Sequence, residues 1–130
     1  ERIDVVMTVL DQERARPYTY GSADCCFTGC AMADALAGTA MAEKYAGSYT
    51  TLAGAQRALR RRKVKSLAEL LQRHLTACAP AEAALGDIVI LRLADGADHV
   101  GVCLGRRFVT KTERGREDYE LGSVQAAFRT

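Results

Sequence analysis

The sequence predicts an α+β domain in which N-terminal helices pack on a small antiparallel sheet. Helical spacing of apolar residues dominates the chain as far as Leu75. From Gly86 onward, short apolar runs alternate with glycine-containing turns, and no internal repeat is present. Helices followed by a meander of strands are the order of an α+β fold. With 130 residues, the chain is expected to form a single domain over residues 1–130.

Four helices are expected in the first part of the chain. Apolar residues at Ile3, Val6, Met7 and Leu10 share one helical face, and Pro17 ends that region. A second helix should run from Cys25 to Ala37, with Ser22 or Asp24 near its N-cap and Gly38 closing it. After a loop over 39–50, the third helix is expected from a Thr50 or Thr51 cap to about Arg62, and the fourth from a Ser66 capping box to about Leu75.

Strands are expected in the second part. Three apolar runs separated by turns predict strands at Ile88–Leu93, Val100–Leu104 and Phe108–Lys111. Tyr119–Leu121 is expected to add a short fourth strand, and Ala126–Thr130 to form a short helix that passes into an edge strand.

Composition limits the classes of partner. The chain is 48% apolar and 26% charged, which is typical of a globular protein and excludes general disorder. Its 18 Lys and Arg against 16 Asp and Glu give a net charge of +2, which is too near neutral to argue for an anionic membrane, and nucleic acid is not expected as a partner. The longest strongly apolar stretch, Ile88–Leu91, is far shorter than a membrane-spanning helix, and no pattern indicates a signal peptide.

The basic run 60–63 is typical of a solvated helix end.

The five cysteines contain the first candidate for chemistry. Their number is odd and three lie within six residues, which argues against a disulfide framework and for reduced thiols. Cys25 falls in the first turn of the second helix, where the helix dipole lowers a thiol pKa. Cys26 becomes the nucleophile instead if the helix phase is shifted by one residue, although a small core residue is the simpler interpretation. Cys30 and Cys103 fit the core, and Cys78 forms no close pair with Cys103, so no zinc site is expected.

One of the two histidines could act on such a thiol. His99 opens a predicted strand directly after a turn, whereas His74 lies on the fourth helix and is expected at the surface. An imidazole next to a thiol can take its proton and later protonate a leaving amine. A histidine at a strand start is more often structural, so only the pairing with Cys25 promotes His99 to a candidate.

Two motifs flank the predicted helices: Tyr20-Gly21-Ser22-Ala23-Asp24-Cys25 before the second helix, and Gly86-Asp87-Ile88-Val89 at the first strand. They resemble the nucleophile motif and the Gly-Asp strand start of the NlpC/P60 cysteine peptidases, and the resemblance covers about Pro17 to Arg129. His99-Val100-Gly101-Val102 with Leu104-Gly105 resembles the strand that bears the family's histidine. The Cys25-Cys26 doublet, the segment 45–55 and the ending Ala127-Phe128-Arg129 are similar to a branch from the tail gene clusters of phages and gene transfer agents.

The resemblance implies a papain-like core and mechanism. Cys25 would be the nucleophile, His99 the general base, and the backbone N–H of Cys25 a donor to the oxyanion. Tyr20 and Asp24 would belong to the substrate cleft. Thr110 stands about where the family has a polar third residue, most often histidine, and a hydroxyl there can accept a bond from the imidazole but brings no charge. No cofactor is implied.

Two functions remain open on these grounds. The first is an enzyme that cleaves peptide bonds of bacterial cell-wall peptidoglycan as part of a phage or gene transfer agent tail. The second is a structural or assembly protein of the tail tip or baseplate with a degenerate cleft. Under both, the expected partners are tail and baseplate proteins, and the protein would be made in the bacterial cytoplasm and reside in a phage-like particle. Cys25 and His99 favour the enzyme. The absence of a histidine at the third catalytic position favours the structural protein.

Overall fold

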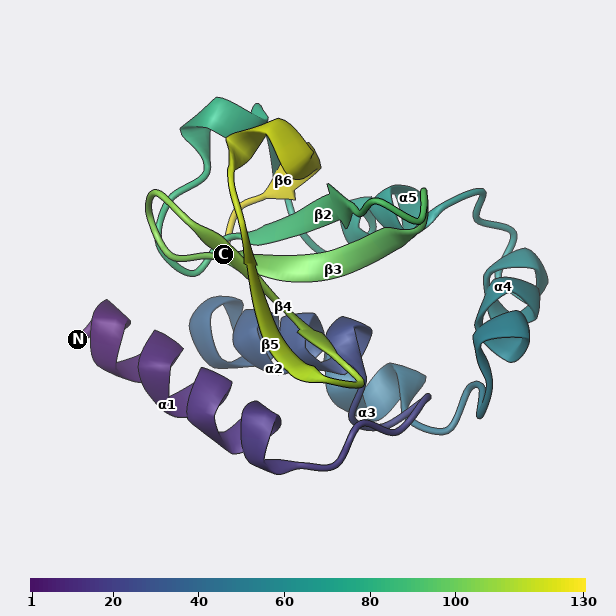
Figure 1. Ribbon diagram of the computed structural model, residues 1–130. Coiled ribbons are helices and arrows are strands. Elements are labelled where there is room, and N and C mark those ends of the chain that lie inside the picture. The colour runs from purple at the N-terminus through teal and green to yellow at the C-terminus, as the bar shows by residue number, and fades with distance from the viewer.

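The computed structural model describes all 130 residues and has the predicted α+β class (Figure 1). The helices are α1 (Arg2–Ala15), α2 (Cys25–Ala37), α3 (Met41–Tyr45), α4 (Leu52–Arg61) and α5 (Leu67–Gln72). The strands are β1 (Ala77–Cys78), β2 (Ile88–Arg92), β3 (Asp98–Cys103), β4 (Phe108–Thr112), β5 (Gly115–Tyr119) and β6 (Val124–Phe128). Two short 3₁₀ turns cover Pro80–Glu82 and Leu121–Ser123. None of the helices has the length and apolar character that crossing a membrane requires.

The six strands form one antiparallel sheet in the order β1-β6-β2-β3-β4-β5. The predicted meander of three apolar strands is confirmed as β2, β3 and β4. The prediction for the C-terminus was wrong, because β6 is a strand inside the sheet rather than a helix that leads to an edge. Residues 88–91 of β2 are almost completely buried, so this strand needs a hydrogen-bonded neighbour on each side. β6 supplies the second neighbour, with Phe128 opposite Ile88.

The spacing of apolar residues does not identify three of the elements. β5 lies at a sheet edge and is mostly charged, and it ends at Tyr119 where the predicted strand began. Charged residues are common on edge strands, where they hinder pairing with other chains. The helix α3 lies inside the expected loop 39–50, and β1 has only two residues. Segments this short contain too few residues for a periodic pattern to identify them.

Helix ends follow the predicted capping chemistry. The side chains of Asp24, Thr51 and Ser66 each accept a hydrogen bond from the backbone N–H three residues on, at 3.1, 3.0 and 3.1 Å respectively. These bonds fix the first residues of α2, α4 and α5. Gly38 ends α2 with a φ of 71°, in the left-handed region that glycine favours. The helix predicted from Ser66 to about Leu75 is α5, and it ends earlier, at Gln72.

The α2 helix packs against one face of the sheet and sets the position of the candidate site. Figure 1 shows α1 and α2 together on one side of the sheet. A Cβ atom added to Gly29 would lie 2.5 Å from Cγ1 of Val100, so the helix and β3 approach more closely than any larger residue allows. The main hydrophobic core lies between these helices and the face of the sheet that bears Ile88, Ile90 and Val100. This close packing brings the α2 N-terminus to the beginning of β3.

Candidate active site

Cys25 is the first residue of α2, and its thiol lies against β3. The pairing of β3 with β4 ends at Gly101 and Thr110. The next N–H group of β3, that of Val100, is therefore free of β4 and lies close enough to the Cys25 sulfur to favour the thiolate by hydrogen bonding. This N–H belongs to the peptide unit that joins His99 to Val100. The Cys25 thiol therefore lies beside the backbone of His99, the candidate general base.

The imidazole of His99 is buried at its polar atoms and has no partner. Neither ring nitrogen is accessible to solvent, and neither makes a hydrogen bond. The carboxylate of Asp95 approaches Nε2 only to 4.0 Å. His99 pairs with Leu91, so its side chain leaves β3 on the face opposite to Val100, which packs against α2. The expected thiol–imidazole hydrogen bond is therefore absent in this resting arrangement, although the two residues meet at one peptide unit.

Thr110 does not take the place of a third residue. Its hydroxyl donates to the Val100 carbonyl oxygen at 2.7 Å and closes the end of the β3–β4 pairing. The expected role was to accept a hydrogen bond from the imidazole, but neither ring nitrogen of His99 makes any hydrogen bond. The expectation that Thr110 orients the imidazole is therefore wrong for this structure, and its role is to join the two strands.

Asp24 is a structural residue rather than part of an open cleft. It is buried, and its carboxylate accepts bonds from the Gly21 N–H at 3.0 Å, the Phe27 N–H at 3.1 Å and the Tyr49 hydroxyl at 2.6 Å. These three bonds satisfy the carboxylate and fix the loop before α2. The expected contact of Asp24 with substrate is corrected to the positioning of Cys25.

Tyr18, which the sequence did not identify as a site residue, lies closer to Cys25 in its interactions than Tyr20 does. Its hydroxyl lies close enough to the Cys25 thiol and the Cys25 backbone N–H to influence the pKa values of both side chains. Burial, with the nearby Cys25 and Asp24, raises the pKa of the Tyr18 hydroxyl, so it remains protonated at neutral pH. Tyr20 packs edge-on against Tyr18 at 5.5 Å and donates to Glu113 at 3.3 Å. The tyrosine at the thiol could not be chosen from sequence because two tyrosines stand two residues apart.

Lys111 holds the loop before Cys25 in place. Its buried ammonium donates to the carbonyl oxygens of Glu13 and Ala23, each at 2.7 Å. It thereby ties the end of α1 and the residue before Asp24 to β4. Burial is the main cause that lowers the pKa of Lys111. Sequence reasoning gave no signal for this role, because both acceptors are backbone oxygens about 90 residues away along the chain.

All five cysteines are free, and Cys26 points away from the site. Its thiol faces Cys30 and the Tyr49 hydroxyl, and the hydrogen bond with Cys30 together with burial raises its pKa well above the usual range. Cys30 and Cys103 are buried in the core, as predicted. No group of three or more His, Cys, Asp or Glu side chains could hold a metal ion. The orientation of Cys26 favours Cys25 as the candidate nucleophile.

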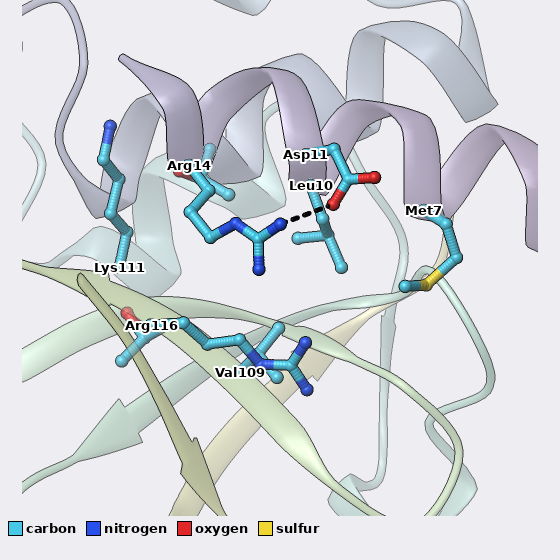
Figure 2. A pocket seen from close by; sticks show the side chains of 9 residues that line it. Met7, Leu10, Asp11, Arg14, Val109, Lys111 and Arg116 are labelled. Carbon is cyan, nitrogen blue, oxygen red and sulfur yellow. Dashed lines mark hydrogen bonds and ion pairs between the residues drawn. The ribbon is translucent and has the colours of Figure 1, made fainter. Parts of the chain in front are cut away.

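A surface pocket borders this region on the α1 side (Figure 2). Met7, Leu10 and Arg14 of α1 face Val109 and Arg116 of the sheet across it, and Arg14 bonds to Asp11 at 3.0 Å. The pocket wall also includes Thr110 and Lys111. A second pocket, lined by Glu13, Arg16, Ser22, Phe27, Ala31, Ala42 and Ala46, lies near the start of α2. Cys25 and His99 line neither of these two pockets.

The electrostatics of Cys25 differ from the sequence-based expectation. Burial, together with the nearby Cys26 and Asp24, raises its pKa to about 12, and this outweighs the favourable bonds from Val100 and Tyr18. The helix N-terminus therefore does not produce a thiolate at neutral pH, because the thiol is removed from water. The predicted lowering of the pKa was wrong.

A pH profile of alkylation checks this pKa. A raised pKa means that the thiolate fraction of Cys25 grows about tenfold for each pH unit below that value. We expect the rate of Cys25 modification by iodoacetamide, followed by peptide mass spectrometry, to be about 100-fold higher at pH 9 than at pH 7. A rate that levels off below pH 8 would show a lowered pKa instead.

Residues 3–130 match DUF6950, which is described as a domain of unknown function. The chain belongs to the DUF6950 family. No curated protein matches the chain. The description of DUF6950 names no activity.

Proposed function

We propose that this DUF6950 protein is a cysteine peptidase or amidase that cleaves peptide bonds of bacterial cell-wall peptidoglycan. The observation that supports it best is the position of Cys25, which begins α2 with its thiol at the peptide unit between His99 and Val100. The resemblance to NlpC/P60 peptidases supports the wall peptide as substrate. The similar phage and gene transfer agent branch supports a place in a particle tail, with tail and baseplate proteins as partners.

In the proposed reaction, His99 acts during the attack rather than before it. The Cys25 thiol is neutral at rest because its pKa is raised to about 12, so no preformed ion pair is available. The reaction requires a rearrangement at the start of β3 that brings the His99 ring from the opposite face to Cys25. The sulfur then bonds to the carbonyl carbon while its proton moves to the imidazole. The imidazolium then protonates the leaving amine as the C–N bond breaks. Water attacks the thioester, releases the acid and restores the thiol.

The start of α2 supplies stabilisation for the oxyanion. Backbone N–H groups in the first turn of a helix have no partner within the helix. The N–H of Cys25 is such a group, and the Tyr18 hydroxyl lies beside it. When a substrate oxygen replaces the contact between them, both groups can donate to it and favour its negative charge. Asp24 and Lys111 keep this turn fixed through their bonds to the preceding loop.

The test compares two cysteine variants on purified peptidoglycan sacculi. Cys25→Ala is expected to lower the release of wall peptides, followed by liquid chromatography, by about 1,000-fold or more, because the nucleophile is lost. Cys26→Ala is the matched control, since its thiol neighbours Cys25 in the chain but faces Cys30. Equal release by wild type and Cys25→Ala would contradict the proposal, and loss only in Cys26→Ala would transfer the role to that residue.

Specific observations favour a second candidate function, a structural or assembly protein of the tail tip or baseplate. The Cys25 pKa is raised, His99 has no hydrogen-bond partner, and Thr110 is engaged with the backbone. A site of this kind is also what a catalytically weak cleft would show. Co-purification with tail particles, combined with unchanged peptide release by Cys25→Ala, would support this function over the enzyme.

A further inference from the structure

Positive charge is concentrated on α4 and the segment that follows it. Residues 57–73 contain seven Lys or Arg and one acid, a net charge of +6, whereas the rest of the chain contains eleven Lys or Arg and fifteen acids, a net charge of −4. The overall +2 therefore conceals a strong separation of charge. We name the exposed part the α4 basic surface: Arg57, Arg60, Arg61, Lys63, Lys65 and Arg73.

The cations of this segment have no acidic partners. None of the seven makes an ion pair, whereas seven of the eleven Lys and Arg elsewhere in the chain do. Its one acid, Glu69, accepts a bond from the backbone N–H of Lys65 instead. Like charges held together in this way repel one another. A bound polyanion would relieve that repulsion, and the protein itself does not.

Hydrogen bonds connect the α4 basic surface to the loop beside the candidate active site. Arg61 donates to the Ser48 carbonyl oxygen at 3.1 Å, and Arg62 to the Ser48 hydroxyl at 3.4 Å. The next residue, Tyr49, donates to Asp24 at 2.6 Å. Asp24 caps the helix that begins with Cys25. Figure 1 shows α4 on the same side of the molecule as the turn that precedes His99.

We propose that the α4 basic surface binds the carboxylate groups of the peptidoglycan peptides and holds the wall polymer beside Cys25. The inference rests on the proposed function, which supplies the polymer. Guanidinium groups match carboxylates geometrically, and a mesh of wall peptides presents many carboxylates at once. Residues 57–73 contain no aromatic side chain, so the base stacking that single-stranded nucleic acid needs is missing. Leu52 is the only large apolar side chain of α4 that is exposed, which disfavours insertion into a lipid surface.

The binding test uses the Cys25→Ala protein, so that binding is measured without turnover. In this background, Arg57→Glu/Lys63→Glu is compared with Arg106→Glu/Arg129→Glu, which changes the net charge equally at cations that also lack ion pairs. The first pair should weaken co-sedimentation with purified sacculi about tenfold or more at 50 mM salt, and the second less than about twofold. Circular dichroism should show equal melting of both variants, because all four residues are exposed.

Two further binding experiments test whether the surface binds the carboxylates of the wall. Sacculi whose carboxylates have been converted to amides should lose most of their binding, because the partner charge is gone. Equal weakening by both pairs of substitutions, no weakening by either, or unchanged binding to amidated sacculi would overturn the proposal. Tighter binding to double-stranded DNA or to anionic vesicles than to sacculi, with the same dependence on Arg57 and Lys63, would assign the surface to that other partner and overturn it too. A failure of catalysis appears separately, in the peptide release by wild type and Cys25→Ala.

Discussion

His99→Leu is expected to lower the turnover of wall peptide by about 100-fold or more while leaving the fold intact. Both ring nitrogens of His99 are buried without a hydrogen-bond partner. Leaving polar groups in that state costs about 1–3 kcal/mol, and leucine has no such groups. The free energy of unfolding in urea should therefore stay the same or rise. A structural histidine would show the opposite pattern, with lost stability and unchanged turnover.

His74→Leu is the matched control, because the chain has only these two histidines. His74, expected at the surface, is half-buried: its Nε2 hydrogen-bonds with the Tyr45 hydroxyl at 2.5 Å and its ring packs edge-on against the Tyr45 ring. Removing it leaves the hydroxyl of a buried tyrosine without this partner. We expect a loss of about 1–3 kcal/mol in stability with little change in turnover. Equal effects of the two substitutions on turnover would contradict the role of His99.

Gly21→Ala is expected to destabilise the protein by about 3–5 kcal/mol, measured by urea unfolding. Gly21 has a φ of +88°, and a Cβ atom added there would lie 1.8 Å from the carbonyl oxygen of Tyr49. The neighbour is backbone, so it cannot turn aside as a flexible side chain would. The Gly21 N–H also donates to Asp24. The substitution should therefore disturb the cap of α2 and reduce peptide release together with stability.

Gly38→Ala separates the steric effect from the backbone strain. Gly38 has a similar φ of +71°, but no atom lies within 4 Å of its added Cβ. Its substitution should cost only the left-handed strain, about 1 kcal/mol, and should leave peptide release unchanged. If both variants lose the same stability, the close approach of Gly21 to the Tyr49 carbonyl does not explain why position 21 needs a glycine.

Local chemistry made the first half of the fold predictable. Asp24, Thr51 and Ser66 are capping residues followed by helix formers, and each caps the helix expected of it. The position of Cys25 at the start of a helix follows from one such cap. β6 could not be foreseen, because its Ala-rich segment favours a helix locally and becomes a strand only beside the buried β2.

The surroundings of the site depend on contacts that no local pattern encodes. The Val100 N–H lies near Cys25 because the pairing of β3 with β4 ends at Gly101, so Val100 has no partner on β4. Lys111 reaches two backbone oxygens, one near the end of α1 and one in the loop before α2. Even the sign of the Cys25 pKa shift was wrong from sequence, since the helix position was visible but the burial was not.

The most direct test of the Cys25–His99 pair is covalent trapping with a wall-peptide vinyl sulfone, an electrophile that a thiol attacks without a leaving group. Intact-mass and peptide mass spectrometry give the number and position of the adducts. We expect one adduct per chain, on Cys25, formed at least about 100-fold more slowly in His99→Leu. An adduct on Cys26 or Cys78, or equal rates in wild type and His99→Leu, would contradict the catalytic pair.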